Sequence, residues 1–180
     1  DTANMMNKVF EVIEAYKLFN FDKKKYRVII HPQSYVHSIV RFKNGLTKMI
    51  LYNTDMKIPI FNTLYKGKNN FFKTSNVEIK HINNLNFQKV NSKTFPSIKL
   101  LNKCFTSGLS TPIIINAANE VLVDLFLKGK IEFLDIVRTI NRLFSDKDFK
   151  KYAKRNPKSI KDIKKADYWG RLKTTYMCVK

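Results

Sequence analysis

DTANMMNKVFEVIEAYKLF, residues 1–19, predicts an amphipathic helix over residues 4–19. Apolar side chains recur at helical spacing and should face a core: Met5, Met6, Val9, Phe10, Ile13 and Tyr16, with Leu18 and Phe19 as further candidates. Asp1 or Thr2 can cap the start of this helix, because both side chains accept hydrogen bonds from free backbone N–H groups. The interpretation of the whole chain depends on what this helix does.

Polar side chains occupy another side of the same helix. Asn7 and Glu11 are four residues apart and Lys8 and Glu11 are three apart, so all three reach neighbouring positions. With Thr2 and the free N–H groups at the helix start, Asn7 and Lys8 could bind a phosphate, while Glu11 could hold a metal ion. An ordinary Lys–Glu surface pair explains the same spacing, and no second acidic ligand stands nearby.

Composition excludes several classes of protein. The chain has 180 residues with 44% hydrophobic content, which is typical of a globular protein. No apolar run approaches the roughly 20 residues that span a bilayer, and the two cysteines form no disulfide framework or metal spacing. The net charge of +20 comes mostly from lysines, 28 of the 34 cations, scattered through every segment. This scatter favours a codon bias toward Lys and Asn over a nucleic-acid surface, although attraction for anionic ligands stays possible.

The middle of the chain predicts short strands. We expect residues 26–30 (YRVII) to form a short buried strand and HPQS at residues 31–34 to form a turn. Lys43-Asn44-Gly45 should join the two strands of a hairpin. Residues 54–65 predict an extended entry and a short helix. Residues 66–93 read as a polar linker with at most one or two strands, such as VEIKHI.

The last part of the chain has helical periodicity. We expect four helices in a bundle: PSIKLLNKCF, ending near Gly108; PIIINAANEVLVDLFLKG, ending at Gly129; IEFLDIVRTINRLF; and NPKSIKDIKKADYWGRLK, with Asn156 as N-cap and Pro157 at the first position. Within the second, the small residues of NAANE allow close helix packing. The fold class is therefore α+β: a mixed part over residues 1–65, a linker over 66–94 and a helical part over 95–180. Because the chain starts within a helix pattern, we expect it to be the C-terminal part of a longer protein.

Other chemistry has weaker support. His31 and His37 bracket Ser34, but no nucleophile elbow accompanies the serine, so a hydrolytic triad is not indicated. There is no Gly-rich phosphate loop and no Rossmann fingerprint among the five glycines. A nucleotide cofactor would need its main binding domain elsewhere.

The chain resembles one family in several ordered motifs. DTANMMNKVFEVIEAYKLF, VIIHPQSYVHSIVRF, DMKIPI, FPSIKL, INAANEV and IEFLDI occur in the order and at the spacing of 1-deoxy-D-xylulose 5-phosphate reductoisomerases. The resemblance is strongest over residues 1–60 and 95–140. It implies conversion of 1-deoxy-D-xylulose 5-phosphate to 2-C-methyl-D-erythritol 4-phosphate in non-mevalonate isoprenoid biosynthesis. It also implies NADPH and a divalent cation, Mn²⁺ or Mg²⁺, as cofactors, and a homodimer.

The resemblance assigns roles residue by residue. Thr2, Asn7, Lys8, Glu11 and Ser34 would bind substrate, with Glu11 also the metal ligand. Lys8 and His37 would be catalytic, and Met56 would lie near the nicotinamide. Residues 1–65 would belong to the central catalytic domain and residues 95–180 to a C-terminal helical domain.

Four positions depart from the family pattern: Thr2 is usually Ser, Asn4 is usually Thr or Ser, Val9 is usually Gly, and Thr54 is often Pro. The other two metal carboxylates, the lid loop and the N-terminal Rossmann domain would precede Asp1. We therefore expect the 180-residue chain alone not to turn over, and we expect the N-terminal half of the enzyme to be its partner.

Two other functions remain open: a basic module that binds RNA or another polyanion without catalysis, and a non-catalytic piece retained for dimer formation. We favour the enzyme, with a phosphorylated sugar as its small-molecule partner and with neither nucleic acid nor membrane. The Lys and Asn bias is similar to that of parasites with AT-rich genomes. It therefore makes a plastid, the apicoplast, the expected compartment for such a source, and the cytoplasm otherwise.

Overall fold

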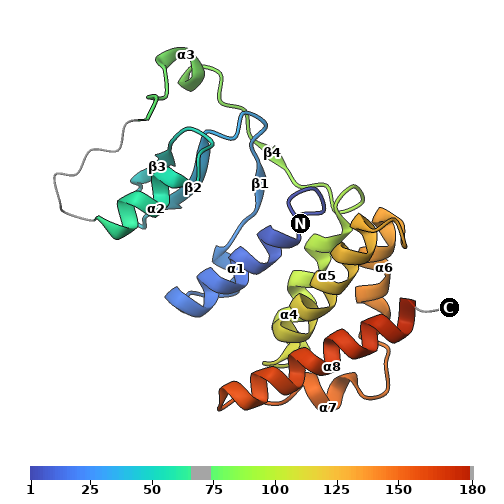
Figure 1. The fold of residues 1–180 in the computed structure, drawn as a ribbon. Helices are drawn as coiled ribbons and strands as arrows, with labels where there is room; N and C mark the ends of the chain where they lie inside the picture. The colour runs from blue at the N-terminus through green and yellow to red at the C-terminus, as the bar shows by residue number, and fades with distance from the viewer. Residues whose placement is uncertain (66–73, 179–180) are drawn as a thin grey trace. The chain divides into compact units, whose positions relative to one another are not determined.

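The structure is a computed structural model that describes residues 1–65 and 74–178. Its contacts divide the chain into two compact units: Asp1–Arg27 with Asn91–Lys180, here called the helical unit, and Val28–Val90, the hairpin unit. Figure 1 shows helices throughout and only short strands, which confirms the α+β class. The units differ from the expected division into residues 1–65, 66–94 and 95–180, which stays a prediction.

The helical unit joins the first helix to the C-terminal ones. Its elements are α1 (Met6–Phe19), η1 (Lys23–Lys25), η2 (Pro96–Lys99), α4 (Leu100–Thr106), α5 (Thr111–Leu127), α6 (Phe133–Leu143), α7 (Phe149–Ala153) and α8 (Ile160–Cys178). Met6 and Val9 of α1 are fully buried and share one core with side chains of α4, α5 and α6. α1 is therefore an integral part of the helical unit, and its position is set by apolar packing.

The predicted helix over residues 4–19 is largely confirmed, but its cap is wrong. The helix begins at Met6, after Met5 adopts the left-handed conformation with φ of 61°. Asn4 Oδ1 accepts a hydrogen bond from the Met6 N–H at 2.9 Å, so Asn4 and neither Asp1 nor Thr2 satisfies this first free donor. At the other end, Leu18 and Phe19 are 77% and 62% exposed and do not face the core.

The helices predicted in the last part are present, with two corrections. A short extra helix, α7, lies between the third and fourth predicted helices. The fourth begins at Ile160, because Ser159 Oγ accepts from the Asp162 N–H while the Asp162 carboxylate accepts from the Lys158 N–H. This reciprocal pairing replaces the predicted start at Asn156 and Pro157.

Close packing of α5 against α8 confirms the prediction for the NAANE segment. Ala117 and Ala118 are fully buried. A Cβ placed on Gly170 of α8 would lie only 3.1 Å from the Ala117 Cβ, so small residues on both helices allow the approach. Cys104 lies in the same core, and its burial raises the pKa of its thiol to about 12.

The hairpin unit contains β1 (Ile29–Ile30), β2 (Val36–Arg41), β3 (Thr47–Leu51), α2 (Lys57–Leu64), α3 (Ile79–Ile82) and β4 (Gln88–Lys89). β2 and β3 pair antiparallel around the turn at residues 43–45, and Gly45 has φ of 88°, as predicted for an Asn-Gly turn. The short helix within residues 54–65 is also confirmed.

Two strand predictions in this unit are wrong. Only Ile29 and Ile30 of residues 26–30 pair, with β4, and Ile29 is 43% exposed. Tyr26 lies outside the strand, and its hydroxyl donates to the Ala15 carbonyl of α1. VEIKHI holds the single-turn helix α3, whose His81 ring stacks on Tyr35. Within the predicted linker, residues 66–73 lie outside the described residues.

Candidate functional site

α1 places the three predicted polar residues side by side. Asn7, Lys8 and Glu11 lie in its first turns, and the Lys8 ammonium donates to both oxygens of the Glu11 carboxylate at 2.8 and 3.0 Å. Lys8 and Glu11 are about half exposed, at 44% and 51% of their side-chain surfaces. This contact is the ordinary Lys–Glu pair that the spacing allowed, and it puts a cation and a carboxylate at one point of the surface.

A cavity of about 620 Å³ borders this side of α1. Four carboxylates line it: Asp1, Glu11, Glu14 and Asp167. The remaining lining residues come from α1, α5 and α8: Asn7, Phe10, Ile13, Pro112, Ile113, Asn116 and Ile163. The Asp167 carboxylate forms a salt bridge with Arg171. The hydrogen bonds that Arg171 donates to Asp167 and Glu120 raise the pKa of its guanidinium.

One buried atom at this cavity has no partner. Asn7 Oδ1 is shielded from solvent and accepts no hydrogen bond in the described part of the chain. A buried amide oxygen without a donor is costly, typically about 1–3 kcal/mol. A ligand that supplies a hydrogen-bond donor or a cation would remove this cost.

The donor set suits a hard divalent cation only in part. The Glu11 carboxylate and the Asn7 amide are oxygen ligands of the kind that Mg²⁺ and Mn²⁺ prefer. Within residues 1–65 and 74–178, however, no group of three His, Cys, Asp or Glu side chains is arranged to hold a metal ion. Within these residues, Glu11 could therefore be only one member of an incomplete ligand set.

The segment before α1 is anchored by residues that the sequence analysis did not single out. The Ser97 hydroxyl, fully buried in η2, donates to the Asn4 carbonyl. Asn119 Nδ2 of α5 donates to Asp1 Oδ1 at 2.8 Å. The sequence did contain one signal, an Asn at position 119 within an apolar helix pattern, because an amide buried there needs a hydrogen-bond partner. Thr2 lies between these anchors and is exposed.

The other predicted site residues belong to the hairpin unit. His37 is in β2, where its Nε2 donates to the Tyr52 carbonyl at 3.1 Å and its ring stacks on Tyr52 with centroids 3.6 Å apart. Ser34 closes the turn after β1 with φ of 59° and is exposed. Met56 immediately precedes α2 and is 67% exposed. The structure thus places Thr2, Asn7, Lys8 and Glu11 on one unit, where Lys8 pairs with Glu11, and it places Ser34, His37 and Met56 on the other.

Two departures from the family pattern have structural explanations. Asn4 accepts the hydrogen bond from the Met6 N–H through its amide oxygen, and the hydroxyl of Ser or Thr is also a suitable acceptor for such a donor. Val9 is fully buried in the core and does not line the cavity beside Glu11. Nothing in the structure explains Thr54.

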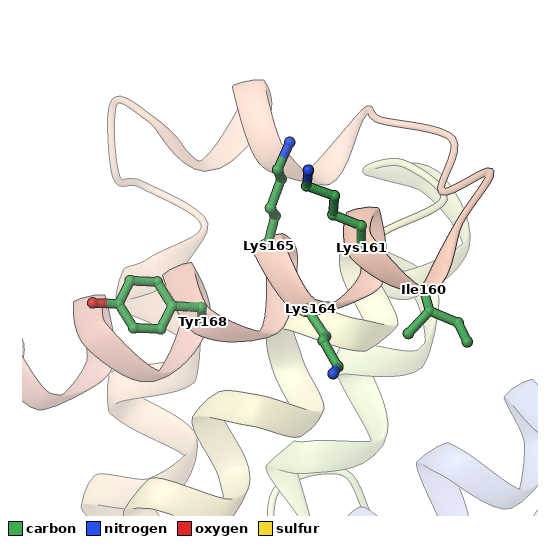
Figure 2. Close-up of a pocket in the computed structure, with 5 residues that line it drawn as sticks. All are labelled: Ile160, Lys161, Lys164, Lys165 and Tyr168. Atoms are coloured by element: carbon green, nitrogen blue, oxygen red, sulfur yellow. The ribbon is translucent and has the colours of Figure 1, made fainter.

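A second cavity, about 470 Å³, lies at the start of α8 and is basic. Lys161, Lys164 and Lys165 line it with Ile160 and Tyr168. Figure 2 shows Lys161 and Lys165 pointing the same way and Lys164 pointing to the other side of the helix. None of the predicted site residues lines this cavity.

Comparison with known proteins identifies the family. A model of the DXP reductoisomerase C-terminal domain matches residues 51–173. The chain belongs to the DXP reductoisomerase family. The enzyme of that name from Pelagibacter ubique is 42% identical over 179 residues, and that from Aquifex aeolicus is 37% identical over 174, covering 99% and 96% of this chain.

Solved structures of DXP reductoisomerases share the fold. The Zymomonas mobilis enzyme in complex with NADPH matches with a TM-score of 0.88 at 30% identity, covering 100% of this chain and 46% of that one. A complex of DOX-P reductoisomerase with NADPH, fosmidomycin and magnesium matches with a TM-score of 0.92 at 29% identity, covering 99% and 45%. The chain spans about half the length of the relatives it matches, namely 46% and 44% of the two bacterial sequences.

Proposed function

We propose that this chain supplies the C-terminal half of a 1-deoxy-D-xylulose 5-phosphate reductoisomerase. The reaction would convert 1-deoxy-D-xylulose 5-phosphate and NADPH to 2-C-methyl-D-erythritol 4-phosphate in non-mevalonate isoprenoid biosynthesis. Membership of the family supports this function. The observation that supports it most is that one cavity is lined both by Glu11 and by Asn7, whose buried amide oxygen has no hydrogen-bond partner among the described residues.

The start of α1 would hold the substrate. A phosphate dianion beside Thr2 would accept a hydrogen bond from its hydroxyl and meet the positive end of the helix dipole. The Lys8 ammonium would then have two anionic partners available, the substrate and Glu11. Binding the phosphate at one end of the substrate would restrict the orientation of the reacting carbons at its other end, which favours the reactive geometry.

Glu11 would be this chain's ligand to Mn²⁺ or Mg²⁺, with Asn7 as a neighbouring oxygen donor. When bound, the cation polarises substrate oxygens and NADPH provides the reducing hydride. Both oxygens of Glu11 accept from the Lys8 ammonium, so a bound cation would compete with Lys8 for this carboxylate. The other two carboxylates would come from the N-terminal half of the enzyme.

The hairpin unit would contribute three further residues. Stacking on Tyr52 holds the His37 ring, and the hydrogen bond to the Tyr52 carbonyl places the proton of the neutral ring on Nε2, which makes Nδ1 the acceptor. A free acceptor on a fixed ring suits proton exchange with substrate. Ser34 would donate its exposed hydroxyl to substrate, and the exposed Met56 would pack near the nicotinamide.

The partners would be the N-terminal half of the enzyme and a second copy in a homodimer. Ile39 and Met49 pair on one face of the hairpin, Val40 and Ile50 point to the other, and all four are 37–54% exposed. A two-stranded sheet with apolar groups on both faces needs covering elements for stability. The N-terminal half is the covering partner that the length of the relatives predicts.

The expected compartment and the absence of nucleic-acid or membrane partners remain predictions. The relatives named above are bacterial, and the plastid expectation rests on composition alone. Within the part of the chain that the structure describes, no helix has the length and apolarity to cross a membrane.

One observation favours the alternative of a basic polyanion-binding module. Among the residues that the structure describes, those lining the cavity at the start of α8 include three lysines and no carboxylate (Figure 2). Such binding would weaken steeply with salt and would tolerate loss of Glu11. The reductoisomerase function predicts the opposite dependence on Glu11.

The loss of NADPH absorbance by the longest native form of the protein tests the proposal. We expect consumption only when 1-deoxy-D-xylulose 5-phosphate and Mn²⁺ are both present, with 2-C-methyl-D-erythritol 4-phosphate as product. EDTA and omission of substrate are the controls. Absence of turnover in a folded protein would overturn the proposed function, and retention on an RNA or polyphosphate matrix at low salt would then support the alternative.

A further inference from the structure

Two buried side chains of the helical unit hold the segment that carries Thr2. Asn119 is 1% exposed in the middle of α5, and its Nδ2 donates to Asp1 Oδ1 at 2.8 Å. Ser97 is fully buried in η2, and its hydroxyl donates to the Asn4 carbonyl. One anchor therefore lies immediately before Thr2 and the other two residues after it.

The same segment contains a backbone conformation that needs support. Met5 has φ of 61°, a region that costs a non-glycine residue about 1 kcal/mol or more. Its N–H donates to the Thr2 carbonyl at 3.1 Å, and the Met6 N–H donates to Asn4 Oδ1. The turn is thus closed by its own hydrogen bonds and fixed to the helical unit by Ser97 and Asn119.

Thr2 is the exposed member of this anchored turn. A hydroxyl that must donate to a phosphate loses conformational freedom on binding, and a turn fixed beforehand lowers that loss. We propose that Asn119 and Ser97 are positioning residues that fix Thr2 for the substrate phosphate, which gives the helical unit a direct part in substrate binding. This inference rests on the proposed function.

The test uses the longest native form of the protein with three variants. Asn119→Leu removes the donor at similar volume, Ser97→Ala removes the hydroxyl, and Asp1→Ala removes the acceptor from the exposed end without touching the core. Thr139→Val, which changes another buried polar side chain of the helical unit, is the matched control. The measurements are the KM for substrate, the KM for NADPH, kcat and the inhibition constant of inorganic phosphate.

We expect each of the three variants to raise the substrate KM and the phosphate inhibition constant about five- to tenfold, the scale of one lost ordering contact. The KM for NADPH should stay unchanged, and Thr139→Val should match the wild type in all four constants. A merely structural role would lower the amount of active enzyme without moving the phosphate constant.

Unchanged substrate KM and phosphate inhibition in folded variants would overturn the inference. If Asn119→Leu and Ser97→Ala do not fold, the substrate KM and phosphate inhibition constant of Asp1→Ala alone test the inference. A wild type without turnover would instead show failure of the proposed function itself, before any variant is compared.

Discussion

At the scale of single residues, one side of α1 lines the cavity and another packs into the hydrophobic core. Asn7, Glu11 and Glu14 border the cavity, whereas Met6 and Val9 face the core. The departure at Val9 therefore concerns stability more than chemistry, because its side chain is fully buried away from the carboxylates.

We predict that Val9→Gly lowers the free energy of unfolding by about 3 kcal/mol. Loss of the buried isopropyl group and the cavity that it leaves account for about 2.5 kcal/mol, and the lower helix propensity of glycine than of valine accounts for about 0.5. Glu14→Gly, on the exposed side of the same helix, isolates the propensity and should cost only about 1 kcal/mol. Urea unfolding followed by circular dichroism measures both, and equal losses would show that Val9 contributes nothing to the core.

Residue patterns predicted which polar residues of α1 are neighbours better than they predicted the contacts around them. Helical spacing alone placed Asn7, Lys8 and Glu11 together, because three- and four-residue separations return to one side of any α-helix. The anchors Ser97 and Asn119 contact Asn4 and Asp1 across more than 90 residues of sequence. Local periodicity carries no information about such contacts.

At the scale of elements, starts of helices were the least predictable feature. Asn156 and Pro157 have the right residue types for a helix start, yet Ser159 and Asp162 form the reciprocal pair that begins α8. Several capping residues stood within a few positions, and the choice among them depended on tertiary packing. Apolar periodicity over ten or more residues, by contrast, predicted α1, α5 and α6 well.

A salt bridge between the α6–α7 connection and α8 makes stability depend on pH. Burial of Asp146 raises its pKa, but the hydrogen bonds from Lys173, at 2.7 Å, and from the Asp148 N–H, together with the charges of Lys173 and Lys147, outweigh this and leave the pKa below its usual value. The unfolded chain then binds its proton at higher pH than the folded chain. The pair therefore stabilises the fold fully above the ordinary Asp pKa, and the contribution is lost as pH falls through the lowered one.

We predict that the wild type loses more stability than Lys173→Met when pH falls from about 5 to about 2. Unfolding by urea at each pH gives the two slopes. Lys128→Met, which removes a more exposed pair with Asp124, should keep the wild-type slope. Parallel curves for the wild type and Lys173→Met would contradict a role for this bridge.

At the scale of the whole molecule, the two compact units divide the predicted site. The helical unit carries Thr2, Asn7, Lys8 and Glu11, and the hairpin unit carries Ser34, His37 and Met56. The chain spans 46% of the Pelagibacter relative, and its described residues contain no complete metal site. Both observations agree with the proposal that residues of the N-terminal half of the enzyme complete the metal site.

We therefore predict that the 180-residue chain alone does not consume NADPH when it is given substrate and Mn²⁺. One carboxylate ligand cannot retain the cation at useful affinity, and the main dinucleotide-binding domain would lie in the other half. The longest native form at equal concentration is the control. NADPH consumption by the purified chain alone would contradict this division of the site.

The central claim, that Glu11 is this chain's metal ligand in the reductoisomerase reaction, is tested most directly by two matched variants of the longest native form. Glu11→Gln removes the carboxylate, while Glu14→Gln makes the same change three residues away at the same cavity. We predict that Glu11→Gln abolishes Mn²⁺-dependent NADPH consumption with the fold intact, and that Glu14→Gln keeps it. Equal turnover in both variants and the wild type would contradict the account.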